Sequence, residues 1–259
     1  MYWKTQGLVL REVAYRDTDK LLTVLTRDRG KMTLKARGVR RSRSPMKAAC
    51  QLLACSEFTV FEYRGMSTVN EAQTVDLFPE LRADLELLSL GTYFAQVAEV
   101  LSQEDDPNPE LLSLTLNGLY ALGKLHRPQL LVKGAFELRA ACLAGYAPDL
   151  GECRICGNPE PDRFVLTGGC LECAGCHSTD GVRLPVTPGI LAAMRYVTDC
   201  PSSKLFSFQL QDASLRAFSG LAERYLSTQL ERGFTALDFY HSLFPALDSG
   251  DEGHGLSRT

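Results

Sequence analysis

The sequence lacks a long run of apolar residues. No stretch approaches the roughly 20 consecutive apolar residues that a membrane-spanning helix needs. Arg11 and Glu12 interrupt the first apolar segment at the point where the core of a signal peptide would continue. We therefore expect a protein that stays inside the cell and makes no contact with the membrane.

Motifs of catalysis are also lacking. The four histidines are dispersed, and the sequence contains neither a His-Glu-x-x-His nor a Gly-x-Ser-x-Gly stretch. The segment from Gly118 to Leu125 approaches a phosphate-binding loop, but leucine replaces the hydroxyl residue that would ligate Mg²⁺, and the surrounding pattern is helical. We predict that the protein is not an enzyme.

Net charge is small, but it is distributed unevenly. The 259 residues include 28 lysines and arginines against 31 acidic residues, a formal net charge of -3. Residues 1–47 contain 13 basic and four acidic residues, which leaves 15 basic and 27 acidic residues for 48–259. The N-terminal region is therefore strongly basic and the rest is acidic, so nucleic acid remains a candidate ligand.

The N-terminal region has the pattern of a small β-unit. Its apolar residues alternate with polar ones from Thr5 to about Val75, and Val, Thr, Leu and aromatic residues are frequent. In one predicted strand Leu34 and Ala36 share a face, while Lys35 lies on the opposite, cationic face. Five short strands in about 70 residues fit a closed barrel of the OB type. These strands are expected at residues 7–13, 21–26, 31–37, 55–63 and 68–75.

A cluster of positive charge follows the third of these strands and enters a loop that contains glycine and serine. A cationic strand face and loop on an OB barrel form a common platform for a phosphate backbone. We predict phosphate contacts from five residues: Lys35, Arg37, Arg40, Arg41 and Arg43. Four aromatic residues are candidates either for base stacking or for the core and rim of the barrel: Tyr2, Trp3, Tyr15 and Tyr63.

Apolar residues recur at helical spacing after Pro79. We expect helices at residues 80–102, 110–124, 129–143, 188–198 and 211–231, followed by a short apolar segment at 234–244. Residues 245–259 are polar and rich in glycine, which is typical of a disordered tail.

Five of the nine cysteines fall within residues 153–176. An odd total and this local cluster favour a metal site over a disulfide framework. Cys153 and Cys156 form one Cys-x2-Cys knuckle, followed by Gly157. Four thiolates around Zn²⁺ leave no open position for water, so we predict a structural site. The remaining cysteines, expected in buried apolar packing, are Cys50, Cys55, Cys142 and Cys200.

The second knuckle has two possible positions. Both Cys170-x2-Cys173 and Cys173-x2-Cys176 have the spacing of a zinc ribbon. We favour Cys173 and Cys176, because Gly175 provides the same turn element as the glycine after the first knuckle. Cys170 or His177 could substitute for one of the ligands.

The order of these parts resembles the RecO family of bacterial recombination mediator proteins, over about residues 1–244. The resemblance rests on Gly7-Leu-Val-Leu10, Lys35-Ala-Arg37-Gly38-Val-Arg40-Arg41, Phe136-Glu137-Leu138-Arg139, Gly145-Tyr146-Ala147-Pro148, Cys153-x2-Cys156-Gly157 and Gly168-Gly169. It implies an α+β multidomain fold, with an N-terminal OB-fold barrel and an α-helical domain that carries an inserted four-cysteine zinc ribbon. The predicted parts are a DNA-binding barrel (1–78), a helical body (79–149 and 184–244), a zinc-binding insertion (150–183) and a tail (245–259).

The resemblance also implies a function. Proteins of this family bind single- and double-stranded DNA, anneal complementary strands without ATP, and work with RecR, and in many bacteria RecF, to load RecA onto DNA coated by single-stranded DNA-binding protein. The resemblance further implies one structural Zn²⁺ per chain and a cytoplasmic, nucleoid-associated location. The alternative is a zinc-ribbon scaffold that binds nucleic acid or protein, for example in transcription.

Overall fold

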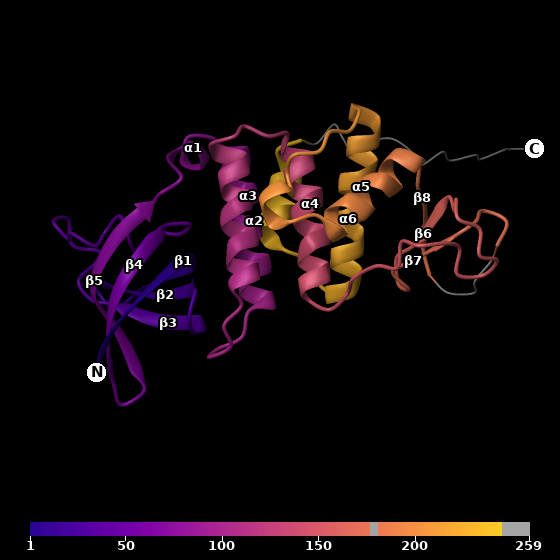
Figure 1. Cartoon of the computed structure of the whole chain (residues 1–259). Helices are drawn as coiled ribbons and strands as arrows, with labels where there is room; N and C mark the ends of the chain where they lie inside the picture. Colours follow the sequence, from indigo (N-terminus) through magenta and orange to yellow (C-terminus); the bar gives the residue numbers. More distant parts are fainter. Residues whose placement is uncertain (177–180, 245–259) are drawn as a thin grey trace, which may run out of the picture.

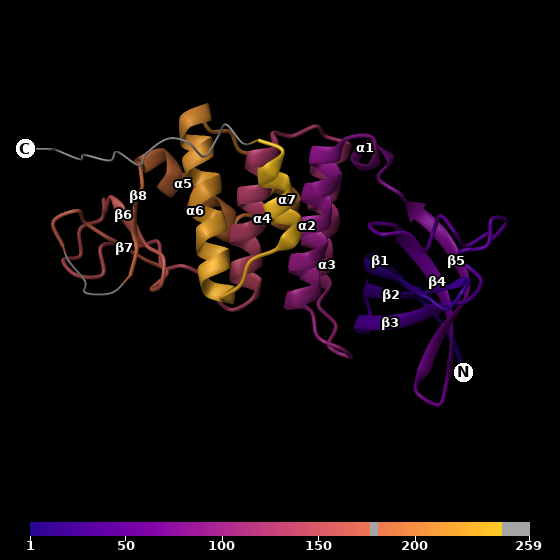
Figure 2. The ribbon, with the colours of Figure 1, turned by 180° about the vertical axis from the view of Figure 1, so that it is seen from behind.

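The computed structural model describes residues 1–176 and 181–244 of the 259-residue chain. A β-barrel, a helical body and a small β-sheet follow one another along the molecule (Figure 1), and the view from behind shows the same order (Figure 2). The predicted fold class is therefore confirmed. The predicted tail, residues 245–259, lies outside the described residues.

The barrel contains five strands, β1 (Tyr2–Tyr15), β2 (Asp19–Thr26), β3 (Gly30–Ala36), β4 (Cys55–Tyr63) and β5 (Met66–Asp76). They close in the order β1-β2-β3-β5-β4, which is the five-stranded Greek-key architecture of the OB-fold. Alternate residues, such as Leu22, Val24 and Leu34, are fully buried in its interior. This burial explains the period-two pattern of the sequence.

Strand β1 begins five residues earlier than the prediction, because it serves two partners. Its first half, from Tyr2 to Leu8, pairs with β4, and its second half pairs with β2. The register shifts between Val9 and Arg11. Such a bulge bends a strand, which helps the barrel to close.

The helical body consists of α1 (Pro79–Arg82), α2 (Leu85–Leu101), α3 (Pro109–Gly123), α4 (Gln129–Leu143), α5 (Pro188–Asp199), the 3₁₀ turn η1 (Ser202–Lys204), α6 (Asp212–Leu230) and α7 (Thr235–Ser242). The prediction of one helix over 80–102 is wrong in one respect. The helical conformation is interrupted at Asp84, which separates α1 from α2. This residue is extended, and its carboxylate accepts hydrogen bonds from the backbone N–H groups of Glu86 and Leu87. Asp84 is therefore the N-cap of a new helix.

Helices α4 and α6 approach each other closely at Gly134. A Cβ at this position would lie 2.8 Å from Phe218 Cε1 and 3.1 Å from Ser219 Cα. On its other side α4 packs against α2, where the Phe136 and Phe94 rings stack with their centroids 3.9 Å apart. Helix α4 is thus the centre of the helical body.

A buried ion cluster lies beside this contact. Lys133 is 1% exposed, and its Nζ lies 3.0 Å from Glu137 Oε1 and 2.5 Å from Glu223 Oε2. Burial alone would lower the pKa of Lys133, but the two carboxylates raise it above its usual value. The Tyr93 hydroxyl donates a hydrogen bond to Glu137, and His241 contacts Glu223. The cluster therefore links α2, α4, α6 and α7.

Replacing Lys133 by methionine should lower the free energy of unfolding by about 3 kcal/mol, because it leaves a buried carboxylate without its cation. Lys124→Met is the matched control. Lys124 Nζ lies 2.8 Å from Glu80 Oε1, but both side chains are about one-third exposed, so solvent screens the pair and this loss should be much smaller. Urea denaturation measures both changes. Equal losses of unfolding free energy in the two variants would show that burial does not determine how much the ion cluster stabilises the protein.

The barrel is attached to α2 and to the loop that follows it. Arg11 Nε lies 2.9 Å from Glu99 Oε1, and Lys31 Nζ donates to the Glu99 carbonyl oxygen. The Lys31 backbone N–H also donates to the Gln103 carbonyl oxygen. Leu25 of β2 and Leu53, before β4, share an apolar core with these helices, so this end of the barrel packs on the helical body.

We call the segment between α4 and α5 the cysteine module. It contains three short strands, β6 (Arg163–Val165), β7 (Cys170–Glu172) and β8 (Arg183–Pro185), in the order β7-β6-β8. The turn between β6 and β7 contains the predicted Gly168-Gly169 bend, which is confirmed. The module packs on α6, where the rings of Phe164 and Tyr225 meet edge to face with their centroids 5.1 Å apart.

Candidate nucleic-acid interface and metal centre

The turn that follows β3, residues 37–47, is called the basic turn. Gly38 adopts a φ of 63°, which favours glycine, and its N–H donates to Asp19 Oδ1 at 2.8 Å. The Arg40 N–H donates to the Thr18 carbonyl oxygen at 2.9 Å. Between them Val39 is fully buried in the barrel core. The basic turn is therefore held against the loop between β1 and β2.

Four of the five predicted cations lie on this turn and are exposed to solvent: Arg37, Arg40, Arg41 and Arg43. Within residues 1–176 and 181–244, none of the four forms an ion pair. One guanidinium nitrogen of Arg40 donates to the Arg16 carbonyl oxygen at 3.2 Å. Guanidinium groups that are exposed and not paired with a carboxylate can bind phosphate oxygens in bidentate fashion.

Lys35 differs from these arginines. The sequence predicts an exposed cationic strand face, but Lys35 is only 8% exposed. Its Nζ lies 3.3 Å from Asp19 Oδ2 and 4.9 Å from the centre of the Tyr15 ring. The Gly38 N–H and, to a smaller extent, Lys35 lower the pKa of the Asp19 carboxyl. Lys35 is buried because Asp19, at the start of β2, and Tyr15, at the end of β1, lie against it. Its predicted phosphate contact stays a prediction.

Arg16 is a cation that the sequence analysis missed. It lies in the loop between β1 and β2, is exposed, and places its guanidinium 5.3 Å from the Tyr15 ring centre. In OB-folds this loop borders the face that binds oligonucleotides. The signal in the sequence was a charged tripeptide, Arg16-Asp17-Thr18, between two predicted strands.

The four candidate aromatic residues divide into two pairs. Trp3 is partly buried beneath Arg29, whose Cζ lies 4.1 Å from the ring centre. Tyr15 is partly buried and contacts Lys35. Tyr2 and Tyr63 are exposed. The second pair therefore presents more ring surface to a ligand than the first.

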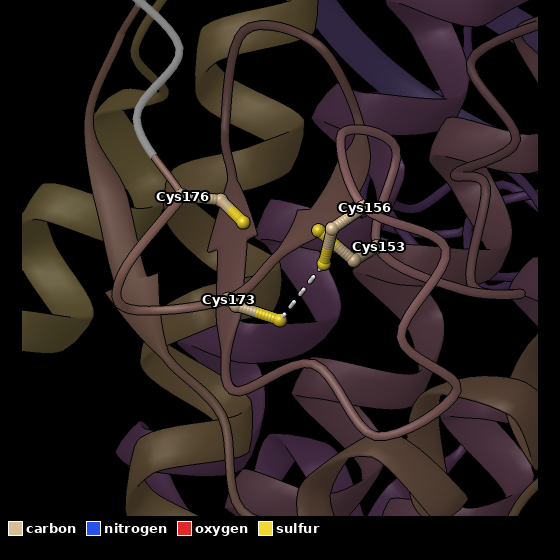
Figure 3. A group of neighbouring side chains, drawn as sticks. All are labelled: Cys153, Cys156, Cys173 and Cys176. Atoms are coloured by element: carbon tan, nitrogen blue, oxygen red, sulfur yellow. Dashed lines mark hydrogen bonds between the residues drawn. The ribbon is translucent and has the colours of Figure 1, made fainter.

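The cysteine module brings together Cys153, Cys156, Cys173 and Cys176, whose side chains converge on one point (Figure 3). All four Sγ atoms lie within 4.8 Å of one another, and those of Cys156 and Cys173 are 3.8 Å apart. Sulfurs bound tetrahedrally to zinc at about 2.3 Å are roughly 3.8 Å apart. The four cysteines therefore lie close enough to hold a metal ion.

The structure also distinguishes between the two possible second knuckles. Cys170 is buried outside the cluster, and its Sγ accepts a hydrogen bond from Arg154 Nη1 at 3.4 Å. The cluster contains Cys173 and Cys176, as the position of Gly175 had suggested. His177, the other substitute ligand considered, lies outside the described residues.

Hydrogen bonds and crowding set the protonation of the thiols. Burial raises the pKa of Cys153, but backbone N–H groups, first that of Cys156, lower it to about 6. The pKa of Cys176 rises to about 12, because Cys156 and burial both oppose its ionisation. Asn158 Nδ2 donates to Cys173 Sγ at 3.1 Å. The crowded thiols thus oppose one another's ionisation, and a bound divalent cation would favour their deprotonated form.

A buried carboxylate connects the two knuckles. Glu172 is fully buried, with Arg183 Nε 3.2 Å from its Oε2 and Arg154 Nε 3.7 Å from its Oε1. Arg154 belongs to the first knuckle, and Arg183 Nη2 donates to the Cys173 carbonyl oxygen of the second at 2.6 Å. These contacts fix the backbone around the cysteine ligands, as hydrogen-bond partners of the ligands do in metal sites.

The metal centre and the basic turn lie at opposite ends of the molecule, with the helical body between them (Figures 1 and 2). A ligand on the basic turn would therefore not reach the metal. The segment that resembles a phosphate-binding loop begins inside α3 and has no preceding strand. None of the helices in the described part of the chain is long and apolar enough to cross a membrane.

Comparison with known proteins agrees with this arrangement. The model of the family "Recombination protein O N terminal" matches residues 1–78, and that of "Recombination protein O C terminal" matches residues 82–238. The DNA repair protein RecO of Acetivibrio thermocellus is 34% identical over 245 residues, which cover 93% of this chain and 97% of the relative. The RecO of Desulforudis audaxviator is 31% identical, with 93% and 97% covered. The chain belongs to the RecO family of DNA repair proteins.

Proposed function

We propose that this protein binds single- and double-stranded DNA through the basic turn and anneals complementary strands without ATP. The observation that carries the proposal is the set of four exposed arginines on a turn that the barrel holds in place: Arg37, Arg40, Arg41 and Arg43. The sequence analysis added Lys35 to this set. Its ion pair with Asp19 supports a role in holding the turn instead.

The mechanism is electrostatic. Two DNA strands repel each other through their phosphates, and cations that neutralise both strands lower this repulsion so that the bases can pair. The acidic helical body would not attract DNA, which confines binding to the barrel. No nucleotide hydrolysis is required for this step.

Family membership supports a role as a recombination mediator. In this proposal the protein acts with RecR, and in some cells with RecF, to load RecA onto DNA coated by single-stranded DNA-binding protein. Its location would then be the nucleoid, in the cytoplasm. The helical body, which is separate from the basic turn, offers surfaces for these protein partners (Figure 1).

We further propose that the metal is Zn²⁺, one per chain, with a structural role. Four thiolates are the ligand set of structural zinc sites, and they leave no position for a reactive water molecule. When bound, the ion would fix the two knuckles relative to each other. The distance of the module from the basic turn supports this role (Figure 1).

An annealing assay tests the proposed function. Complementary oligonucleotides are mixed with the full-length protein in the absence of nucleotide, and duplex formation is followed by fluorescence. We expect pairing to accelerate at low salt and to slow steeply as salt rises, because the cation contacts are screened. Pairing that the protein does not accelerate would contradict the proposal and favour a zinc-ribbon scaffold for protein partners.

A further inference from the structure

Three aromatic rings form a continuous strip on the outside of the barrel, on the strands β1 and β4. Tyr2 of β1 pairs across the strands with Phe61 of β4, and their ring centroids are 4.8 Å apart. Tyr63 lies two residues farther along β4, and its ring is stacked parallel to that of Phe61 at 6.4 Å. We call these three residues the aromatic strip. They extend to the turn between β4 and β5, which projects from the barrel beside the N-terminus (Figure 1).

The strip is open to solvent. Tyr2 is 61% exposed and Tyr63 is 59% exposed, so packing in the barrel uses less than half of either residue. The core of the barrel is complete without them, since Phe58 and Val60 of the same strand fill its interior. Exposed rings that touch one another are a potential binding surface, because each leaves one face uncovered.

Positive charge borders the strip. The Arg64 guanidinium lies 5.3 Å from the centre of the Tyr63 ring, and Lys4 is exposed two residues after Tyr2 on β1. Glu62, between the two strip residues of β4, is paired with Arg29 at 3.5 Å. The exposed acid Glu71 pairs with Thr59, at the level of Lys4. The hairpin end of the strip is therefore cationic and attracts an anion.

We propose that the aromatic strip is a stacking platform for the unpaired bases of single-stranded DNA. Aromatic rings beside cations are the usual means by which proteins bind single strands without sequence preference, because every base has a ring face. A duplex keeps its bases stacked inside and cannot use such a platform. An apolar protein segment would also cover the rings, but the flanking cations favour a polyanion.

The platform and the basic turn lie at opposite ends of β1. Tyr2 begins this 14-residue strand, and Tyr15 at its other end pairs with Asp19, which holds the basic turn. Across the strands the path is short, because Tyr2 pairs with Phe61, Phe61 with Thr68 of β5, and Thr68 with Lys35, which lies two residues before Arg37. Three strand spacings amount to on the order of 15 Å. One short DNA strand would therefore reach both sites. The inference rests on the proposed DNA binding and adds a site that discriminates single strands from duplexes.

The test compares a single-stranded oligothymidine, long enough to span β1, with a duplex of the same length. Tyr2→Ala and Tyr63→Ala in the full chain should each weaken single-strand binding about tenfold. Duplex affinity and the dependence of binding on salt should not change, because no phosphate contact is removed. Tyr63→Phe keeps the ring and should bind normally. Tyr120→Ala, at a 48% exposed tyrosine on α3, is the matched control and should have no effect.

A second measurement uses the unmodified protein. An oligonucleotide that contains 2-aminopurine should lose fluorescence on binding, because the base stacks on a ring, and the Tyr2→Ala/Tyr63→Ala variant should not quench it. Unchanged single-strand affinity in the folded double variant, or equal losses on single strands and duplexes, would overturn the platform. A changed oligomeric state with normal DNA affinity would overturn it too and assign the strip to protein contacts. In each case binding by the basic turn would survive, whereas absence of DNA binding by the unmodified protein would overturn the proposed function.

Discussion

Replacing Cys176 by serine is expected to abolish metal binding and to unfold the cysteine module. Structural zinc sites bind with apparent free energies of about 10–16 kcal/mol at neutral pH. A whole domain is stable by only about 5–15 kcal/mol. Cys176 is partly exposed, so its own packing contributes little, and a large loss of stability would come from the metal. Elemental analysis and thermal unfolding measure the two effects.

Cys170→Ser is the matched control for this change. Cys170 has the same Cys-x2-Cys relation to Cys173, but its Sγ lies outside the cluster. This variant should retain one zinc per chain and lose only the packing of a buried thiol. Loss of zinc from Cys170→Ser and its retention by Cys176→Ser would show that the metal uses the other knuckle.

Unfolding of the cysteine module should also destabilise α6. Phe164 of β6 packs against Tyr225, whose hydroxyl donates a hydrogen bond to the Tyr146 carbonyl oxygen. Gln229 of the same helix donates to the Leu166 carbonyl oxygen at 2.8 Å. Hydrogen exchange in α6 should therefore accelerate when the metal is removed, while the barrel, at the other end of the molecule, keeps its protection.

The sequence predicts the helices and strands of this protein better than the tertiary contacts of their side chains. The alternation of residues 31–37 correctly assigns Leu34 to the barrel core, because a strand has a period of two. The same alternation gives Lys35 an outward direction, yet it contains no information about Asp19 and Tyr15, which lie against that side chain. The contact with Asp19 joins two strands through a tertiary arrangement, and no local pattern specifies it.

In the helical body and the cysteine module, too, local sequence patterns predict the elements but not every tertiary contact. Hydrophobic spacing predicts a continuous helix over residues 80–102, whereas the capping hydrogen bonds of Asp84 start a new one. Cysteine spacing leaves two positions for the second knuckle, Gly175 favours the one with Cys176, and the three-dimensional arrangement places Cys176 in the cluster and Cys170 outside it. Local chemistry therefore restricts the alternatives, and long-range packing selects among them.

Reversing three arginines of the basic turn is expected to weaken DNA binding about a thousandfold at low salt. In the variant Arg37→Glu/Arg40→Glu/Arg41→Glu, three phosphate contacts are lost and three repulsions are added. Each contact contributes about 0.7 to the slope of log affinity against log salt for single strands and about 0.9 for duplexes. The slope should therefore become shallower by about 2 for single strands and about 3 for duplexes. Fluorescence anisotropy over a salt series measures it.

A control with the same change in net charge separates local contacts from the overall field. Arg216, Arg224 and Arg232 are exposed on or next to α6, in the helical body. Reversing these three should lower the association rate slightly and leave the slope unchanged, because they contact no phosphate in the proposed complex. An equal loss of slope in both variants would mean that DNA is bound by the whole molecule and not by the basic turn.

Lys35→Gln provides the decisive comparison within the barrel. If Lys35 contacts phosphate, the single-strand slope should fall by about 0.7, as for one arginine. The structure instead pairs its ammonium with Asp19, whose other oxygen accepts the Gly38 N–H. Its loss should therefore lower the stability of the barrel and leave the slope for the remaining folded protein almost unchanged. The salt dependence thus distinguishes a cation that binds DNA from one that holds the turn in place.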